Sequence, residues 1–405
     1  MPSGEHHDRK APRRIAPLRV QAFTATSALG RGNGATLRAL RTRTSGLSHN
    51  DFGGQPVDTY IGRVAGIEDE PLPEALQHWD SRNNRLAWLA LKQDGFADAL
   101  DAARQRYDAN RIALVLGTST ACIGATEEAY RNLDVQGCFP QHLRNPLMHA
   151  PHSTCNFLSH ALGLESLCVT VATACSSSAK VFAEGERFIR SGLADAVLVG
   201  GVDSLCDSVL FGFNSLDLVS PDLCRPFDID RNGINLGEAA GFALLTRDGS
   251  GPGLVGYGES SDAFHMSSPR PDGMGARTAI ADALARAGVS ADSVDYVNLH
   301  GTASRKNDEV EAQTISSIFP ARTLASSTKG WTGHTLGAAG ILEAIITLLA
   351  MQDSMAPGTL NTTQIDPACA SRVRIDNTDT ALDTAMSLSF GFGGSNCALV
   401  FGNNA

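Results

Sequence analysis

The chain lacks long hydrophobic runs, paired cysteines and an excess of positive charge. None of its apolar stretches reaches the roughly 18 residues that a membrane span requires. Its nine cysteines are scattered, with no CxxC pair that would indicate a zinc ribbon or a disulfide scaffold. Asp and Glu outnumber Lys and Arg, 43 to 33, and the net charge of -10 argues against a nucleic-acid surface over the whole molecule. We therefore expect a cytoplasmic protein of a reducing compartment, with no membrane span, no signal peptide and no nucleic-acid partner.

The sequence is rich in apolar residues and in glycine. Of its 405 residues, 42% are apolar, 19% are charged and 40 are glycines, as is typical of a well-packed enzyme with many tight turns. Short runs rich in Val, Ile and Leu alternate with helical patterns, which indicates strands covered on both faces by helices. These runs span residues 18–23, 111–116, 196–201, 242–245, 294–299 and 397–401. The pattern predicts an α/β fold built in layers.

The two halves of the chain resemble each other weakly. Residues 111–120 (RIALVLGTST) are similar to residues 295–304 (DYVNLHGTAS), and residues 241–245 (GFALL) are similar to residues 396–400 (NCALV). The similarities occur in the same order in each half, and a turn-rich SGPG segment near residue 250 separates them. The predicted organisation is a flexible tail over residues 1–16, followed by two similar domains over residues 17–250 and 251–405.

Cys175 is the cysteine whose surroundings indicate reactivity. It lies between an apolar segment, residues 169–172 (VTVA), and a helical pattern that starts at Ser176 or Ser177. The unpaired N–H groups and the positive end of a helix favour the thiolate there and can hold an oxyanion. The alternative is a small buried hydrophobic residue, which is the usual state of a free cysteine.

Two histidines follow turns at the ends of expected elements. His300 ends an apolar strand and precedes Gly301, at a position where layered folds commonly build their sites. His334 lies just before the apolar helical pattern of residues 336–349, and the amino end of a helix favours a neutral imidazole that can donate its N–H. A satisfied structural histidine is the alternative for each.

Lys329 and Glu343 are charged residues of the same apolar region. Lys329 lies just before the amino end of the buried helix. The alternative is an ordinary solvated surface charge. Glu343 lies inside the helix, where a carboxylate costs several kcal/mol unless it is paired or hydrogen-bonded. A structural ion pair and a place in a catalytic network are equally consistent with Glu343.

Residues 389–396 (SFGFGGSN) form a glycine-rich turn before the final apolar strand. Gly391, Gly393 and Gly394 around Phe392 permit a backbone that approaches a ligand and supplies N–H donors, with Phe392 as a gating flap. A plain hairpin turn is the alternative. The turn is not a phosphate loop, because it has neither GK[ST] nor GxGxxG spacing.

Together these motifs resemble a known family. TACSSS with Cys175, HGTASRKND with His300, STKGWTGHTLGAAG with Lys329 and His334, and SFGFGGSN with Phe392 are similar to four signature blocks of the elongating, Cys-His-His β-ketoacyl-acyl carrier protein synthases. The resemblance runs from about residue 18 to residue 401 and includes RPFDIDRNGINLGEAAG at 225–241. It implies a thiolase-like fold of two βαβαβαββ halves in a layered α-β-α-β-α architecture.

The resemblance also implies a decarboxylative Claisen condensation. Cys175 accepts an acyl group from acyl carrier protein while the N–H groups of Cys175 and Phe392 hold the oxyanion. His300 and His334 then stabilise the enolate formed as malonyl-acyl carrier protein loses CO2. Lys329, Glu343, Thr302 and Asp308 match the family's supporting groups. No metal or cofactor of its own is implied, because acyl groups arrive on the phosphopantetheine arm of the carrier protein.

The expected partners are an acidic acyl carrier protein and a second synthase subunit, identical or related. Candidates for a basic carrier-protein patch are Arg82, Arg85, Arg131, Arg225, Arg305 and Lys306. The Cys block, with its SSSAK sequence, and the segment at 204–221 resemble synthases of specialised polyene-type pathways more than housekeeping fatty-acid enzymes. The HGTASRKND block departs from the family's usual HGTSTPxxD, which bears on the shape of that loop and its partner contacts.

Two other functions stay open at this point. A pocket-shaping subunit of a heterodimeric synthase would lack the cysteine, whereas Cys175 is present. A thiolase that uses coenzyme A would need a second cysteine near the carboxyl terminus, and Cys397 lies in an apolar strand, as a core residue would.

Overall fold

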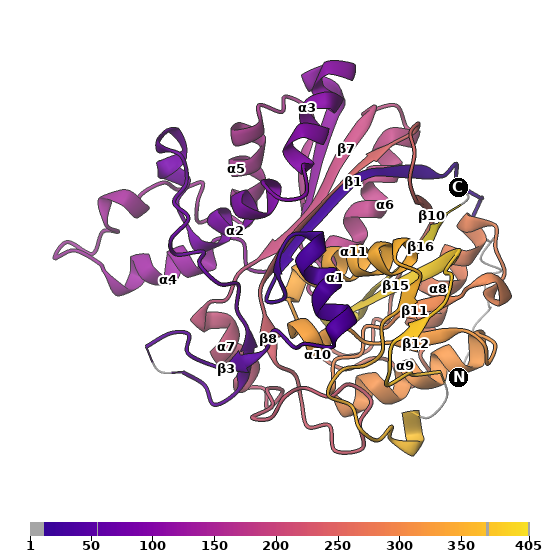
Figure 1. Ribbon diagram of the computed structural model, residues 1–405. Helices are drawn as coiled ribbons and strands as arrows, with labels where there is room; N and C mark the ends of the chain where they lie inside the picture. The colour runs from indigo at the N-terminus through magenta and orange to yellow at the C-terminus, as the bar shows by residue number, and fades with distance from the viewer. Residues whose placement is uncertain (1–11, 55, 370–371, 404–405) are drawn as a thin grey trace, which may run out of the picture.

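The computed structural model describes residues 12–54, 56–369 and 372–403 (Figure 1). Most of the predicted tail, residues 1–16, therefore lies outside the described residues. The strands are β1 (Leu18–Ser27), β2 (Gly30–Arg31), β3 (Ser48–His49), β4 (Tyr60–Gly62), β5 (Ile112–Gly117), β6 (Cys168–Val171), β7 (Ala196–Asp203), β8 (Leu236–Gly237), β9 (Ala239–Thr246), β10 (Gly253–Ser261), β11 (Tyr296–Asn298), β12 (Leu324–Ser326), β13 (Met355–Ala356), β14 (Thr378–Asp379), β15 (Thr384–Gly391) and β16 (Ser395–Gly402). The α-helices are α1 (Asn33–Thr42), α2 (Arg82–Leu91), α3 (Phe96–Arg106), α4 (Ile123–Arg131), α5 (Ser153–Leu162), α6 (Ser177–Arg190), α7 (Asp207–Asn214), α8 (Met274–Ala287), α9 (Arg305–Ile318), α10 (Lys329–Thr332) and α11 (Ala339–Gln352). Within these ranges, none of the helices has the length and apolar character needed to cross a membrane.

One large sheet runs through the molecule with a symmetric strand order. Its main path is β12-β11-β15-β16-β10-β1-β9-β7-β5-β6, and the pairing of β10 with β1 joins the two halves. On each side of this junction, antiparallel pairs lie toward the centre and parallel pairs toward the edge. The similar sequence segments occupy equivalent places in this order, in β5 and β11 and in β9 and β16. Each half is thus built from the same arrangement of strands.

The strands are apolar on both faces because helices cover both faces. Every residue of β5, β7 and β9 is buried. One face of this half-sheet packs against α2, α3 and α5, while the other packs against α6 and α11. The half-sheet of β11, β15 and β16 packs against α8 and α9 on its outer side and against α11 on its inner side. The result is five layers with α6 and α11 in the middle, so the predicted layered α/β architecture is confirmed (Figure 1).

The segments that carry the candidate functional residues all follow the carboxyl ends of strands. Cys175 follows β6, His300 follows β11, the Lys329–His334 segment follows β12, and Phe392 follows β15. Strands β11, β12 and β15 are mutually parallel, so their carboxyl ends meet at one edge of the sheet. Ligands in open α/β sheets bind outside this edge, which makes it the expected place for a site.

Candidate active site

Cys175 lies in a tight turn between β6 and α6. The preceding residue, Ala174, has a φ of 52°, which places it in the left-handed region that residues with a Cβ seldom adopt. The helix α6 begins at Ser177, at one of the two positions predicted from the sequence. The cysteine side chain is only 4% exposed, so the sulfur lies at the amino end of a buried helix and at the bottom of a cavity.

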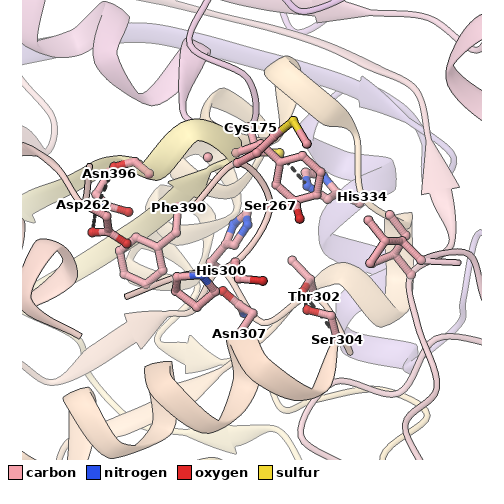
Figure 2. Close-up of a pocket in the computed structure, with 18 of the residues that line it drawn as sticks. Cys175, Asp262, Ser267, His300, Thr302, Ser304, Asn307, His334, Phe390 and Asn396 are labelled. Atoms are coloured by element: carbon pink, nitrogen blue, oxygen red, sulfur yellow. Dashed lines mark hydrogen bonds between the residues drawn. The ribbon is translucent and has the colours of Figure 1, made fainter. Parts of the chain in front are cut away.

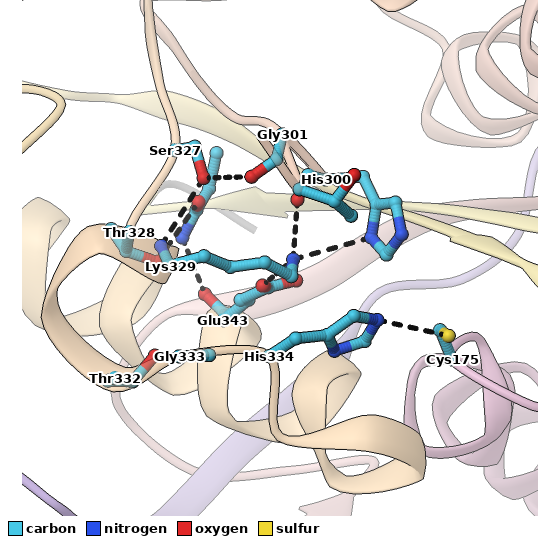
Figure 3. A network of polar contacts seen from close by, with 12 residues as sticks. Cys175, His300, Gly301, Ser327, Thr328, Lys329, Thr332, Gly333, His334 and Glu343 are labelled. Carbon is cyan, nitrogen blue, oxygen red and sulfur yellow. Dashed lines mark hydrogen bonds and ion pairs between the residues drawn. The ribbon is translucent and has the colours of Figure 1, made fainter. Parts of the chain in front are cut away.

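His334 presents an N–H group to this sulfur. Its Nε2 atom is 3.1 Å from Sγ of Cys175. Its Nδ1 atom accepts a hydrogen bond of 3.2 Å from the backbone N–H of Leu336, so the ring proton belongs on Nε2. The backbone N–H of His334 donates to the carbonyl of Asn235 at 2.7 Å. These two backbone contacts fix both the position and the tautomer of the ring. Figure 3 shows the contact between His334 and Cys175.

His300 lies beside His334 with the same tautomer. The two ring centroids are 5.4 Å apart, with the planes nearly perpendicular at 86°. The Nδ1 atom of His300 is 3.4 Å from Nζ of Lys329, which has only protons to offer, so Nε2 carries the ring proton. The sulfur of Cys175 and the nearest nitrogens of both rings all lie within 4.8 Å of one another. The structure therefore brings the predicted cysteine and both histidines into one group.

Lys329 is buried and joined to Glu343. The ammonium group is 1% exposed and donates to Oε1 of Glu343, to the carbonyl of His300 and to Nδ1 of the same ring (Figure 3). The surface alternative for Lys329 is therefore wrong. Burial raises the pKa of the Glu343 carboxyl to about 7, although the neighbouring Lys329 lowers it. Glu343 is both a structural ion-pair partner and, through Lys329, a contact of His300.

Both imidazoles are held in the neutral form. Burial lowers the pKa of His300 and of His334 well below the usual 6.5, and the positive charge of Lys329 lowers each further. The neutral N–H donor predicted for His334 is thus supported by its surroundings. Two neutral donors aimed at one point suit an oxygen that gains negative charge during a reaction.

The ionisation state predicted for Cys175 is wrong for the free protein. The backbone N–H groups of Phe392 and Cys175 and the charge of Lys329 lower the pKa of the thiol, as expected at a helix terminus. Burial outweighs them and raises the pKa of Cys175 to about 11. The reason is that a thiolate with 4% exposure loses most of its hydration, and the helix end replaces only part of it. The neutral thiol is therefore the favoured form of Cys175 in the free protein.

The glycine-rich turn places the N–H of Phe392 next to the sulfur. Residues Phe392–Gly394 form a short 3-10 turn between β15 and β16, in which Gly393 and Gly394 have φ values of 76° and 77°. A Cβ on Gly391 would lie 2.7 Å from the carbonyl of Thr173, so the turn is packed against the Cys175 loop. The N–H groups of Cys175 and Phe392 both reach the sulfur region, which is the arrangement an oxyanion hole requires.

Asp308 and Glu311 hold the turn after His300. Asp308 accepts from the N–H of Thr302 at 3.1 Å, while Glu311 accepts from the N–H groups of His300 and Gly301 at 2.8 Å each. Burial raises the pKa of Asp308 to about 6 and that of Glu311 to about 8. The sequence interpretation included Asp308 but missed Glu311. Its position three residues after Asp308, on the same face of a helix, was the available signal.

A cavity leads from the surface to these groups (Figure 2). Its volume of about 590 Å³, open mouth included, falls in the range of small-molecule sites. The polar side chains in its wall include Thr302, which the resemblance gives as a supporting group, and also Ser304 and Asn307, which the sequence interpretation did not single out. Phe392 and Phe213, whose ring centroids are 5.7 Å apart, line this cavity and also a second one.

The second cavity lies on the other side of Phe392. Both cavities share Cys175, Phe213 and Phe392, so Cys175 borders two spaces. The further lining of the second cavity comes from Ser119, Thr120, Ala172, Ala174, Val209 and Leu336. A third cavity adjoins it, since Ser119, Thr120 and Ala172 line both. The space on this side of Cys175 is therefore continuous with a wall shared by two cavities.

Of the six basic residues predicted as a carrier-protein patch, not all are free to contact a carrier protein. Arg82 is 16% exposed and is bound by the buried carboxylate of Glu238, and Arg85 is bound by Asp80. Both line a separate polar cavity away from Cys175. Arg131 pairs with Asp207, and Arg225 is half-buried. Only Arg305 and Lys306 are exposed next to cavity-lining residues, Ser304 and Asn307.

The described residues contain two groups that offer three possible metal ligands each. One is Cys175 with His300 and His334, and the other is His152 with Cys155 and Cys168. In the first group, Nδ1 of each histidine ring already has a hydrogen-bond partner. A divalent cation bound there would also lie near the positive ammonium group of Lys329, which would repel it. The first group is therefore better suited to donating protons than to binding a metal.

Comparison with known families covers most of the chain. The family "Beta-ketoacyl synthase, N-terminal domain" matches residues 84–250 of this chain. The family "Beta-ketoacyl synthase, C-terminal domain" matches residues 253–363. The chain belongs to the β-ketoacyl synthase family. The predicted family and its class, a condensing acyltransferase of chain elongation, are confirmed.

Individual relatives of this β-ketoacyl synthase agree with the assignment. Nodulation protein E of Rhizobium meliloti (strain 1021) is 35% identical over 357 residues, 84% of this chain and 88% of that protein. The mitochondrial 3-oxoacyl-[acyl-carrier-protein] synthase of Arabidopsis thaliana is 40% identical over 252 residues, 56% of this chain and 55% of that protein. A chain from the complex of the ketosynthase ApeO with its chain length factor ApeC, from Xenorhabdus doucetiae, has a TM-score of 0.87 at 35% identity, over 96% of this chain and 98% of its own. The thiolase-like fold prediction is thereby confirmed.

Proposed function

We propose that this β-ketoacyl synthase joins an acyl group on Cys175 to malonyl-acyl carrier protein, giving 3-oxoacyl-acyl carrier protein and CO2. The observation that carries the proposal is the convergence of one sulfur and two neutral imidazoles. Nε2 of His334 lies 3.1 Å from Sγ of Cys175, and the His300 ring is 5.4 Å from the His334 ring. A proton-donating pair beside a nucleophile matches acyl transfer followed by enolate formation.

In the first half-reaction, Sγ of Cys175 attacks the carbonyl carbon of an acyl thioester on the carrier protein. The tetrahedral oxyanion is held by the N–H groups of Cys175 and Phe392. When the carbon–sulfur bond to the phosphopantetheine arm breaks, the arm leaves as a thiol and takes the proton of the Cys175 thiol. The acyl chain extends into the second cavity, past Phe213 and Thr120.

In the second half-reaction, a malonyl thioester enters through the first cavity. Nε2–H of His300 and of His334 donate to its thioester oxygen as the bond to the carboxylate breaks and CO2 leaves. The electron pair of that bond becomes the enolate, whose carbon attacks the acyl carbonyl on Cys175. The sulfur leaves as a thiolate and takes a proton from solvent water, which restores the thiol. Neutral rings are required, because a cation would favour the malonyl carboxylate and hinder its loss.

The carrier protein approaches the mouth of the first cavity. The support comes from charge and position, because Arg305 and Lys306 are exposed at the amino end of α9, directly after Ser304 in the cavity wall. Phe264 and Met266, exposed to 56% and 71%, add apolar area on the loop at the other side of the mouth. An acidic carrier protein would be attracted by the two basic side chains despite the net charge of -10.

A second synthase subunit pairs with the free edge of the sheet. Strand β6 is the last strand on its side and pairs with β5 alone among the described strands. Its neighbour Leu167 is 42% exposed, and Leu147 in the adjoining region is 52% exposed. An unpaired edge with apolar side chains around it suits the addition of a partner strand. Relatives are titled as complexes of a ketosynthase with a chain length factor, which supports a heterodimer over a homodimer.

The pathway is a specialised polyene or polyketide pathway rather than housekeeping fatty-acid synthesis. Support comes from the similarity to nodulation protein E and from the ishigamide ketosynthase/chain length factor, which has a TM-score of 0.85 at 26% identity over 96% of this chain and 99% of its own. The compartment is the cytoplasm, a proposal supported by the free state of all nine cysteines.

Mass spectrometry of the intact chain tests the proposed function. The protein is incubated with carrier proteins that bear a graded series of acyl chains, alone and together with candidate partner subunits. We expect the mass of one acyl group on the wild type and none on Cys175→Ala. The matched control is Cys397→Ala, because Cys397 is fully buried in the core and should leave labelling intact. Label on Cys175→Ala, or none on the wild type with any acyl group or partner, would overturn the proposal.

A further inference from the structure

The carboxylate of Asp203 lies beneath the second cavity and has no place in the chemistry described above. Asp203 ends β7 and is fully buried. Its Oδ1 atom accepts from Oγ1 of Thr118 and Oγ1 of Thr120 at 2.6 Å each, and from the N–H of Thr120 at 2.8 Å. The N–H of Ser119 lies 3.0 Å from both carboxylate oxygens. One buried carboxylate thus fixes three consecutive residues.

Those three residues form the wall between two cavities. Ser119 and Thr120 line the cavity that contains Cys175 as well as the adjoining one, and Thr118 lines the adjoining one. The loop is not a regular element, and the next residue, Ala121, has a φ of 45°. Without the carboxylate, two hydroxyl and two N–H donors would lack a buried acceptor, so the wall would take another conformation.

The second oxygen of Asp203 reaches another segment that borders the same cavity. Oδ2 accepts from the N–H of Ala338 at 3.1 Å, at the start of the buried helix that follows His334. The residue before Ala338 is Gly337, and a Cβ there would lie 2.7 Å from both Oδ2 of Asp203 and the backbone N of Ser119. Leu336, the residue before this glycine, lines the cavity. Asp203 therefore joins the wall at Thr118–Thr120 to the wall at Leu336–Ala338.

We propose that Asp203 is a positioning residue that sets which acyl lengths Cys175 accepts, by holding these two walls at a fixed separation. The inference rests on the proposed function in one respect, namely that the second cavity holds the acyl chain. The N–H of Leu336 that fixes the tautomer of His334 belongs to one of these walls, so the test of Asp203 compares acylation rates with one another and does not require unchanged malonyl decarboxylation.

Asp203→Asn separates this role from a general contribution to folding. The amide keeps one acceptor oxygen but replaces the other by a donor, which cannot serve both Thr118–Thr120 and Ala338. We expect the ratio of acylation rates for the longest and shortest acyl groups to change by about tenfold, as for the loss of one charged hydrogen bond. The ratio compares two acylation rates of the same variant, so a change in malonyl decarboxylation does not enter it.

The matched control is Asp228→Asn. Asp228 is also buried, at 1% exposure, and its carboxylate accepts from the backbone N–H groups of Asp230, Thr363 and Gln364, none of which lines a cavity next to Cys175. Both variants should lose stability, but only Asp203→Asn should alter the length ratio. An unchanged ratio in a folded Asp203→Asn variant would overturn the proposal.

Thr120→Val keeps the test decisive if Asp203→Asn does not fold. It removes one donor to Asp203 while preserving side-chain volume, so the ratio should shift in the same direction and by less. A ratio equal to wild type in Thr120→Val would then overturn the role of Asp203. If the wild type is not acylated with any acyl length, the proposed function and this inference are both overturned. If the variants are acylated with the wild-type length ratio, only this inference is overturned.

Discussion

The Nε2 atom of His334 lies 3.1 Å from the Sγ atom of Cys175, and the His300 ring stands edge-on to His334 on the side toward Lys329. The two histidines therefore have different neighbours although they share a tautomer. His334 contacts the nucleophile and the backbone, whereas His300 is tied to Lys329. This difference predicts different consequences when each is removed.

His300→Ala should block decarboxylation and spare acylation. The variant removes one of two N–H donors to the enolate oxygen, which should lower malonyl decarboxylation by about 10² to 10³. Acylation of Cys175 should remain within about tenfold of wild type, because the oxyanion of that step is held by backbone N–H groups. The two rates are measured separately, by release of CO2 and by mass spectrometry. An equal loss of both would contradict the assigned roles.

The buried imidazoles predict a specific dependence of stability on pH. Their pKa values are lowered below the usual 6.5, so between 6.5 and the folded-state pKa the unfolded chain binds more protons than the folded one. The stability from each neutral ring is complete above pH 6.5 and is lost as the pH falls toward the folded-state pKa. His300→Asn removes one such group. The stability difference between wild type and variant should therefore decrease by up to about 1.4 kcal/mol per pH unit below 6.5.

Denaturant unfolding at several pH values on both sides of 6.5 measures this difference. His334→Asn should behave in the same way, because burial and Lys329 also lower the pKa of that ring. A difference that does not change with pH for either variant would show that the rings are not held neutral by the fold.

The Lys329–Glu343 pair predicts a stability cost that a double substitution repairs. Lys329→Met leaves the Glu343 carboxylate buried without its counter-ion, which should lower the free energy of unfolding by about 3–5 kcal/mol. Lys329→Met with Glu343→Leu should recover most of this loss, because no buried charge remains. Decarboxylation should stay impaired in the double variant, since Nδ1 of His300 has lost its donor. Recovery of activity along with stability would show that the pair is structural only.

Two adjacent glycines in the turn after Phe392 provide a matched pair of variants. A Cβ on Gly394 would lie 2.7 Å from Cβ of Asp262, whereas a Cβ on Gly393 would meet nothing within 4 Å. Both have positive φ, so each alanine carries about 1–2 kcal/mol of backbone strain. Only Gly394→Ala should also displace the N–H of Phe392, and its acylation rate should fall by about a hundredfold. Similar rates for the two variants would contradict the oxyanion role of Phe392.

Arg305 and Lys306 predict a salt-dependent contact with the carrier protein. Arg305→Glu with Lys306→Glu should lower kcat/KM for carrier-bound acyl groups by about tenfold and remove its dependence on ionic strength. Rates with a small acyl thioester that lacks the protein should not change. Arg106→Glu, an exposed arginine on the outer helix α3, serves as the control. An equal effect of both charge reversals would indicate that the overall electrostatic field of the protein attracts the carrier protein, rather than docking at the mouth of the first cavity.

Local sequence patterns were sufficient for the elements that carry the site. The apolar runs marked strands because burial on both faces leaves no polar positions, and the helix at Ser177 followed from its spacing of apolar residues. The repeated segments RIALVLGTST and DYVNLHGTAS hold equivalent places in β5 and β11. Cys175, His300 and His334 stood out because each follows the end of a predicted strand or precedes a predicted helix.

Other features depend on contacts between distant segments. Asp203 and Glu311 were missed because a carboxylate that accepts from backbone N–H groups across the fold has no local signature. Arg82 and Arg85 were assigned to a patch because sequence does not reveal that Glu238 and Asp80 already bind them.

The amino-acid sequence by itself determined the family, the layered fold and the choice of Cys175, His300 and His334 as candidate site residues, since these follow from short motifs and hydrophobic periodicity. Only the tertiary structure decided the protonation of those groups. Burial raises the pKa of Cys175 to about 11 and keeps both rings neutral, and burial is a property of the whole packed molecule rather than of any segment. The contact of Lys329 with Nδ1 of His300 likewise joins residues 29 positions apart and forms only when β11 and β12 lie side by side, whereas the bond from Leu336 to His334 is local.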